Sequence, residues 1–207
     1  MLLAAAFLAV APVAATKASL AGLYEIRQME IGGGLELKPN GHFRYALSYG
    51  AIDEEGEGDW TFDGKQVLLT SNPMPKGPNF ELVRDDPAPK GELFLKLEDP
   101  GFQWGHPLEV IATPDLKTGF EISADENGKV DLAGKPAIVA ISPKMPIYGS
   151  TGQIFKLSGD RGHKLLFRFH RNDLGKVAFD RQPLARDGPN LHLNRWDTDI
   201  RFIRVQR

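Results

Sequence analysis

Histidine, carboxylate and hydroxyl side chains are the groups that could do acid, base or nucleophilic chemistry in this chain, and their spacing supports none of it. No two histidines stand at the His-x-His or His-x3-His spacing of a metal site. The sequence also lacks a Gly-x-Ser-x-Gly elbow, a Ser-x-x-Lys motif and a phosphate-binding glycine loop. We therefore expect a protein without catalytic residues, metal ligands or a cofactor. The five histidines are His42, His106, His163, His170 and His192.

Two acidic segments could attract a cation. Residues 53–59 hold five carboxylates in seven positions, a pattern that is more often a solvated loop than a cation site. The segment Asp125-Glu126-Asn127-Gly128 resembles a calcium loop only at its start, because it lacks the twelve-residue ligand series that ends in Glu. The sequence favours a solvated loop in the first case and a hairpin turn in the second.

A charged stripe is expected on the strand around residue 168. In Phe167-Arg168-Phe169-His170, strand alternation places Arg168 and His170 on one face and the two phenylalanines on the other. The favoured interpretation is a solvent-facing stripe. The alternative is that Arg168 and His170 bind a ligand.

Four aromatic residues fall on two strands that we expect to be neighbours: Phe43, Tyr45, Trp60 and Phe62. An aromatic-lined barrel interior is one way to hold an apolar ligand, and Phe43, Tyr45 and Trp60 are then the candidate ligand-binding residues. The more frequent alternative at this size is a filled core.

Strands must position all of these groups, because period-2 alternation dominates the chain and no stretch after residue 20 shows a convincing 3.6-residue apolar repeat. Hairpin turns are predicted at Pro39-Asn40-Gly41 and Asp63-Gly64, where Asn and Gly accept positive φ. A further turn is predicted at Gly32-Gly33-Gly34. The predicted fold class is all-β: a small antiparallel barrel or half-barrel with an inserted β-sandwich module.

The Pro- and Asp-rich stretch over residues 71–91 indicates a domain boundary. A meander that starts near residue 22 needs a partner for its open edge, because bare edge strands invite aggregation, and the C-terminal strands can supply it. We therefore expect a discontinuous first domain, 16–88 plus 159–207, with 89–158 inserted. The alternative is two or three consecutive β units.

From residue 22 to residue 70, the succession of strand, tight turn, strand, Gly-x-Trp and hairpin resembles the opening of a lipocalin-like barrel. Lipocalins carry Gly-x-Trp on the first strand and an Arg on the last strand that packs over the Trp. Here the first strand has Gly22-Leu23-Tyr24 and the last has Arg201 and Arg204, so the Trp is missing. The resemblance implies a small barrel in the first domain.

Residues 91–158 resemble a transthyretin-like or carboxypeptidase-regulatory-like β-sandwich. The matching piece is Ser123–Leu132, an Asp-x-x-Gly turn between extended segments, and Gly105-His106-Pro107-Leu108 keeps part of the family's Gly-x-Pro-Leu run. Such modules are structural or binding accessories, which implies a non-catalytic role. The whole chain is similar to uncharacterised exported bacterial β-proteins.

The first fifteen residues predict a signal peptide. Fourteen of them are apolar and none is charged, and the run is shorter than the roughly 20 residues of a membrane-spanning helix. Cleavage is expected after Ala15, with Ala18 as the second choice. Because the chain also has no cysteine, we expect a periplasmic or secreted protein without a transmembrane span in its mature form.

The net charge of −2 hides an uneven distribution. Residues 160–207 carry 11 Lys and Arg against 6 Asp, or +5, which leaves −7 for the rest. The near-neutral total argues against nucleic acid as a partner. We expect an exported, non-catalytic envelope protein that binds or scaffolds a macromolecular partner. The alternative is a carrier of a small apolar ligand in the first domain.

Overall fold

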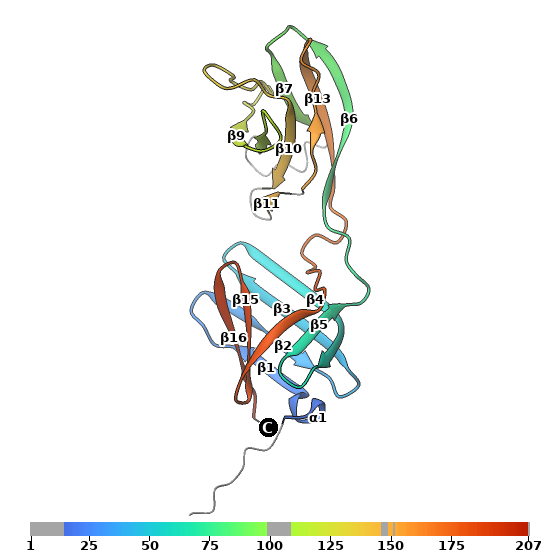
Figure 1. Cartoon of the computed structure of the whole chain (residues 1–207), viewed down its shortest axis with the longest axis vertical. Helices are drawn as coiled ribbons and strands as arrows, with labels where there is room; N and C mark the ends of the chain where they lie inside the picture. The colour runs from blue at the N-terminus through green and yellow to red at the C-terminus, as the bar shows by residue number, and fades with distance from the viewer. Residues whose placement is uncertain (1–14, 99–108, 146–148, 151, 207) are drawn as a thin grey trace, which may run out of the picture. The chain divides into compact units, whose positions relative to one another are not determined.

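The computed structural model describes residues 15–98, 109–145, 149–150 and 152–206. Nearly all of their regular structure is β-strand, which confirms the all-β prediction, and the helix is α1 (Lys17–Leu20). The chain forms two compact units (Figure 1). The first contains the chain up to Met74 and from Phe179 onward, and the second is Pro75–Ala178.

Eight antiparallel strands close the first unit into a barrel. Each strand pairs with the next barrel strand in the chain, and the last pairs with the first, so the ring has no open edge along its full circumference. In order around the ring, the strands are β1 (Gly22–Ile26), β2 (Ile31–Leu37), β3 (His42–Tyr49), β4 (Ile52–Phe62), β5 (Val67–Ser71), β14 (Gln182–Asp187), β15 (Asn190–Arg195) and β16 (Thr198–Arg204).

We call the end at which β1 begins the α1 end of the barrel. The β2–β3 and β4–β5 hairpins turn at this end, at the predicted Pro39-Asn40-Gly41 and Asp63-Gly64. A hydrogen bond from Gly41 N to Lys38 O (3.0 Å) closes the first turn. The helix α1 buries Leu20 at the same end.

We call the opposite end of the barrel the tip end. The β1–β2, β3–β4 and β15–β16 hairpins turn there. The β15–β16 turn is made by Trp196 and Asp197, whose φ angles are 50° and 57°. Two successive positive φ angles match the twist of the flanking strands and give a tight hairpin.

The structure corrects the turn predicted at Gly32-Gly33-Gly34, which lies inside β2; the chain turns instead at Met29 and Glu30. A Cβ atom on Gly33 would lie 2.1 Å from the carbonyl oxygen of Ala46, so a side chain there would collide with the neighbouring strand. These glycines permit close strand approach within the barrel wall, and they do not reverse the chain.

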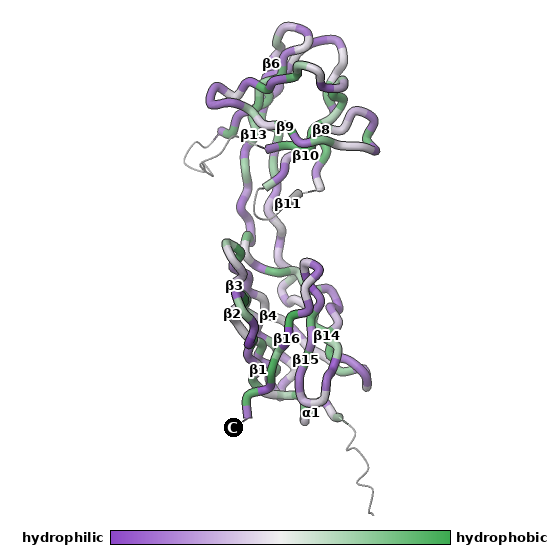
Figure 2. The backbone as a smooth tube through the Cα atoms, turned by 90° about the vertical axis from the view of Figure 1, so that its left-hand side faces the viewer, coloured by the Kyte–Doolittle hydropathy of each residue, from purple (hydrophilic) through white to green (hydrophobic). Residues whose placement is uncertain are grey.

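The structure also corrects the solvated loop predicted for residues 53–59. They lie in β4 and pair with β3. Alternation sends Asp53, Glu55 and Glu57 to the outer surface, so the charges are compatible with a strand in the barrel wall. Figure 2 shows hydrophilic and hydrophobic residues interleaved along the barrel strands.

Two sheets form the second unit, and their apolar faces share one core. In the first sheet the central strand runs antiparallel to one neighbour and parallel to the other. That sheet has the order β6 (Asn79–Ala88), β13 (Gly162–His170) and β7 (Leu93–Leu97). The second sheet contains β8 (Glu109–Ala112), β9 (Phe120–Ser123), β10 (Ala140–Met145), β11 (Gly149–Ser150) and β12 (Phe155–Lys156).

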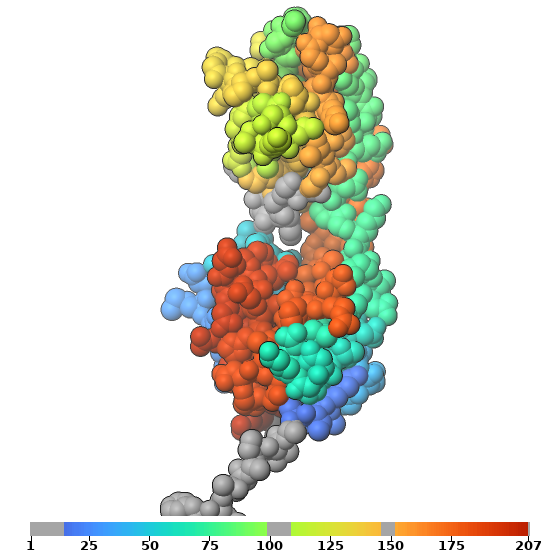
Figure 3. All heavy atoms as spheres, in the orientation of Figure 1, coloured from blue at the N-terminus to red at the C-terminus, as the bar shows by residue number. Residues whose placement is uncertain are grey.

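The boundaries expected at residues 88 and 159 differ from those of the units. Residues 75–88 and 159–178, which we assigned to the first domain, lie in the second unit (Figure 3). The physical reason is the pairing of β6 with β13, which buries Phe80, Leu165 and Phe167 in the core of the second unit.

Candidate functional site

The three aromatic side chains predicted to hold a ligand point into the barrel and pack as core. Phe43, Tyr45 and Trp60 are 0%, 3% and 1% exposed. The ring of Phe179 lies 6.0 Å from that of Phe43 and meets Tyr45 edge-on at 5.1 Å between centroids. Phe202 lies 6.3 Å from Tyr45 on another side. These side chains pack against one another and fill the middle of the barrel.

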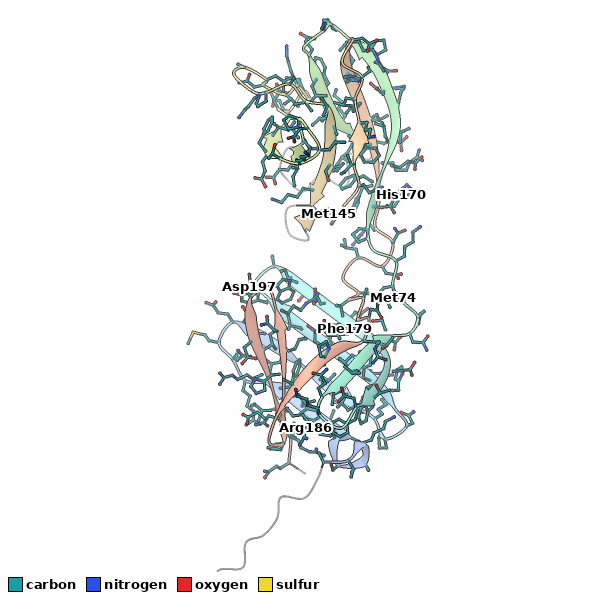
Figure 4. The ribbon with its side chains drawn as sticks, in the orientation of Figure 1. Met74, Met145, His170, Phe179, Arg186 and Asp197 are labelled. Atoms are coloured by element: carbon teal, nitrogen blue, oxygen red, sulfur yellow. The ribbon has the colours of Figure 1, made fainter. Side chains whose placement is uncertain are left out.

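Phe179 is the core residue that sequence reasoning missed. It enters the barrel where the chain returns from the second unit (Figure 4). Its N–H donates to the Ser71 hydroxyl at 2.9 Å, and its carbonyl accepts from Ser71 N at 2.8 Å. Phe179 lies outside the named strands, and the signal for it in the sequence was a short alternation in which Val177 and Phe179 are buried while Ala178 and Asp180 are exposed.

A largely buried ion pair crosses the barrel below the tip end. The Glu54 side chain is 11% exposed, and its carboxylate lies 2.5 Å from the guanidinium of Arg195. The Tyr45 hydroxyl lies 3.5 Å from the same carboxylate. Burial raises the pKa of Tyr45, and the neighbouring charge of Glu54 raises it further. Tyr45 therefore remains a neutral phenol, and the pair ties β4 to β15 across the barrel.

Above this pair, aromatic and cationic side chains gather at the hairpin turns. Tyr49 and Trp196 stack with ring centroids 6.2 Å apart and planes 26° apart, and the Arg195 guanidinium lies 4.7 Å from the Trp196 ring centroid. Trp196 is 40% exposed and Met29, on the β1–β2 turn, is 89% exposed. We call Met29, Tyr49, Arg195 and Trp196 the tip surface.

Acidic side chains surround the tip surface. Glu30, Asp53 and Asp197 lie on the three hairpins of the tip end and are exposed. In the part of the chain that the structure describes, none of the three forms an ion pair. Figure 4 marks Asp197 at the turn of its hairpin. Unpaired carboxylates thus lie on the same hairpins as the exposed aromatic and methionine side chains, which suits a partner that carries positive charge.

Arg168 and His170 lie in the second unit, on the face of β13 opposite the buried Phe167, as alternation predicted. Arg168 donates to both carboxylate oxygens of Glu98 at 2.5 and 3.1 Å, and His170 Nε2 lies 2.7 Å from Glu81. The hydrogen bond from His170 lowers the pKa of Glu81, and that from Arg168 lowers the pKa of Glu98. Both candidates are engaged with surface carboxylates, and they lie in a different unit from the barrel aromatics.

A groove of about 570 Å³ lies beside the Asp125–Gly128 turn of the second unit. The predicted turn forms, because the Asp125 carboxylate accepts from the backbone N–H groups of Asn127 (3.0 Å) and Lys129 (2.7 Å). On the groove wall, the Lys129 amine lies 3.3 Å from the Glu92 carboxylate. Among the described residues, no group of three or more His, Asp or Glu side chains is arranged to hold a metal ion.

His163 of the second unit is buried beside a carboxylate, an arrangement also found in catalytic pairs. Its Nδ1 lies 3.0 Å from Asp85, and its Nε2 lies 2.9 Å from the carbonyl of Ser158. Arg161 also donates to Asp85 at 2.8 Å. Both ring nitrogens are used within the fold, so His163 is a structural residue in this arrangement.

Comparisons with known proteins found no relative, so the fold alone describes the class of this protein. No protein-family model, curated protein or solved structure matches the chain. The lipocalin-like and transthyretin-like resemblances therefore stay predictions. What the geometry defines is an all-β protein with a closed eight-stranded barrel and further sheets. Across the described residues, no helix has the length and apolar character that crossing a membrane requires.

Proposed function

We propose that this is an exported envelope protein that works by binding a macromolecular partner, namely a protein with a basic rim, at the tip surface. The observation that carries the proposal is the packed barrel interior. A small apolar ligand would have to displace Phe179 or Trp60, both 1% exposed, from contacts within the core. Binding at the outer surface requires no such rearrangement.

The tip surface has the residue types that anchor protein interfaces. Trp, Tyr and Arg contribute most of the binding energy in typical interfaces. Trp196 and Tyr49 are held in place by their mutual stacking, and Arg195 is held by Glu54, so these anchors lose little conformational freedom on binding. The unpaired Glu30, Asp53 and Asp197 supply charge complementarity to a basic partner.

The start of the fold supports the proposed export signal. The Thr16 hydroxyl caps α1 by accepting from Ser19 N, and the Ser19 hydroxyl accepts from Thr16 N. Cleavage after Ala18 would remove Thr16 and half of this helix, whereas cleavage after Ala15 leaves the cap intact. We expect mass spectrometry of the exported protein to find Thr16 as the first residue; a mature chain that begins at Met1 would contradict export by this signal.

Native mass spectrometry of protein purified from its own envelope tests the binding function. We expect an assembly larger than the monomer, and we expect Trp196→Ala to remove it because the central anchor is lost. Val139→Ala, which truncates a side chain of similar exposure in the second unit, should leave the assembly intact. A co-purifying small apolar ligand, bound equally by both variants, would favour the carrier and overturn the proposal.

A further inference from the structure

Arg186 has an unusual environment at the α1 end of the barrel (Figure 4). It lies on β14 and shares the inward face with the fully buried Leu184. Its guanidinium carbon is 5.6 Å from the ring centroid of Phe62. The Nε atom is buried and has no hydrogen-bond partner within the described chain, and Nη2 makes only a 3.5 Å contact with the carbonyl of Gly188. A buried donor without an acceptor is rare in folded proteins.

Two other arginines also have a buried nitrogen without a partner, but their positive charges are compensated. Arg161 donates another nitrogen to Asp85 at 2.8 Å, and Arg195 donates to Glu54 at 2.5 Å. Arg186 has no carboxylate within ion-pair distance in the described part of the chain. It therefore combines an unused N–H with an uncompensated charge.

Further cations lie at the same end of the barrel. Arg204 on β16 lies over the Tyr24 ring at 5.7 Å and donates to the carbonyl of Ala21 at 2.7 Å. The Lys17 amine lies 5.0 Å from the ring centroid of Trp60. Neither cation is paired with a carboxylate among the residues that the structure describes. The α1 end thus holds three cations that lie over aromatic rings, and none of the three forms an ion pair with a carboxylate of the described chain.

The pKa of Tyr24 is affected by the positive charges of both Arg204 and Arg186. Burial raises the pKa of Tyr24, while the positive charges of Arg204 and Arg186 lower it. Both guanidinium groups therefore act on one phenol, which donates its proton to the carbonyl of Leu20 at 2.6 Å. An anion placed near Arg186 would be attracted by Arg204 as well.

We infer that the α1 end of the barrel binds a phosphate group, with Arg186 as its principal ligand and with Arg204 and Lys17 adding attraction. A guanidinium can donate two N–H groups to two oxygens of an oxyanion. Three uncompensated cations favour a group that carries close to two negative charges, as phosphate does near neutral pH. The site lies at the opposite end of the barrel from the tip surface and goes beyond the proposed function.

Titration of the full mature chain with inorganic phosphate, at constant ionic strength and followed by amide NMR, tests the inference. We expect saturable shifts for residues 186–190 and 17–24, with at least tenfold weaker binding in Arg186→Gln. Arg27→Gln removes an exposed arginine at the tip end and should bind phosphate as the wild type does. Absence of saturable shifts, or equal affinity in Arg186→Gln and wild type, would overturn the inference.

A second variant distinguishes loss of the phosphate ligand from loss of the fold. Arg186→Lys keeps the charge but loses the two-nitrogen edge, so a folded Arg186→Lys protein should also bind phosphate more weakly. Equal affinity in that variant would remove Arg186 from the role of principal ligand. Trp196→Ala should bind phosphate normally, which separates this site from the tip surface.

Vesicles distinguish a lipid headgroup from a soluble phosphate. One outcome is that the wild type co-sediments with phosphatidylglycerol vesicles and not with phosphatidylcholine vesicles. If Arg186→Gln loses that co-sedimentation, the site is assigned to anionic headgroups. Saturable binding of inorganic phosphate without vesicle binding assigns it to a soluble phosphate.

Discussion

At the scale of single residues, side chains replace missing backbone partners. Gln28 donates to the carbonyl of Asp199 at 2.9 Å and accepts from the N–H of Arg201 at 2.8 Å, so its amide continues the pairing of β16 beyond the end of β1. Gln153 does the same for both backbone groups of Phe80 at the edge of β6. Each amide presents one donor and one acceptor, as a strand would.

Phe179→Ala should destabilise the barrel by about 3–5 kcal/mol, the usual cost of removing a buried Phe ring from a packed core. The variant leaves a space between Phe43 and Tyr45. Urea unfolding followed by NMR signals of the barrel measures the loss. Met74→Ala, at a half-exposed position, should change stability by no more than about 0.5 kcal/mol. A loss below about 1 kcal/mol for Phe179→Ala would show that Phe179 is not a core residue.

Acid should weaken the second unit through Glu81 and Glu98. Their pKa values in the folded state lie below the unfolded value of about 4.3, because His170 and Arg168 stabilise the carboxylates. This contribution is complete above the unfolded pKa and is lost as pH falls through the folded pKa values.

The double variant Glu81→Gln, Glu98→Gln should therefore lose less stability than the wild type between pH 7 and pH 3. Urea unfolding at both pH values measures the difference. Glu55→Gln, whose carboxylate has no ion pair within the described chain, should behave as the wild type does. An equal loss in the double variant and in the wild type would contradict the assignment.

At the scale of elements, strand curvature depends on where glycine stands. In β2, a Cβ atom on Gly33 would lie 2.1 Å from the carbonyl oxygen of Ala46, and its φ of 129° is rarely adopted by other residues. A Cβ on Gly32 would meet nothing within 4 Å. Two adjacent glycines therefore have different requirements in the same strand.

Gly33→Ala should prevent normal closure of the barrel or lower the free energy of unfolding by more than about 3 kcal/mol, because a collision adds to backbone strain. Gly32→Ala should stay within about 1 kcal/mol of the wild type. Thermal unfolding of the two variants makes the comparison. Equal midpoints would mean that β2 does not need glycine at residue 33.

Local sequence patterns predicted the elements that depend on local physics. The turns at Pro39-Asn40-Gly41 and Asp63-Gly64 follow from φ preferences, and the all-β class follows from alternation. The turn predicted from the glycine run and the loop predicted from the acidic run were wrong. Both predictions relied on composition, but a barrel strand accepts glycines where strands approach closely, and it accepts acidic residues that face outward. The residues of the tip surface were missed, because Tyr49 and Trp196 meet only through the closure of the ring.

At the scale of the whole molecule, the barrel is built from two chain segments separated by the second unit. Ser71 and Phe179 join them through two hydrogen bonds, so the segments meet although 107 residues lie between those positions. The second unit has its own core of buried side chains from both sheets. All the residues of this core lie in the second unit.

A chain in which a short Gly-Ser linker replaces residues 75–178 should therefore fold into the barrel. The Ser71–Phe179 contact holds the two ends close enough for such a linker to connect them. Circular dichroism and amide NMR should show β-structure with the barrel signals of the full chain. An unfolded product would mean that the barrel needs the second unit in order to form.

The pairing of β6 with β13 has a consequence for the order of folding. Asn79 and His170 are register partners, and Asp173 N donates to the carbonyl of Lys76, so the ends of the second unit lie side by side once it has folded. Once the second unit has folded, β5 and β14 are separated only by the few residues that connect each strand to the paired ends of that unit. Since the entropy lost on closing a loop grows with its length, we expect the barrel to close faster after the second unit has formed than before.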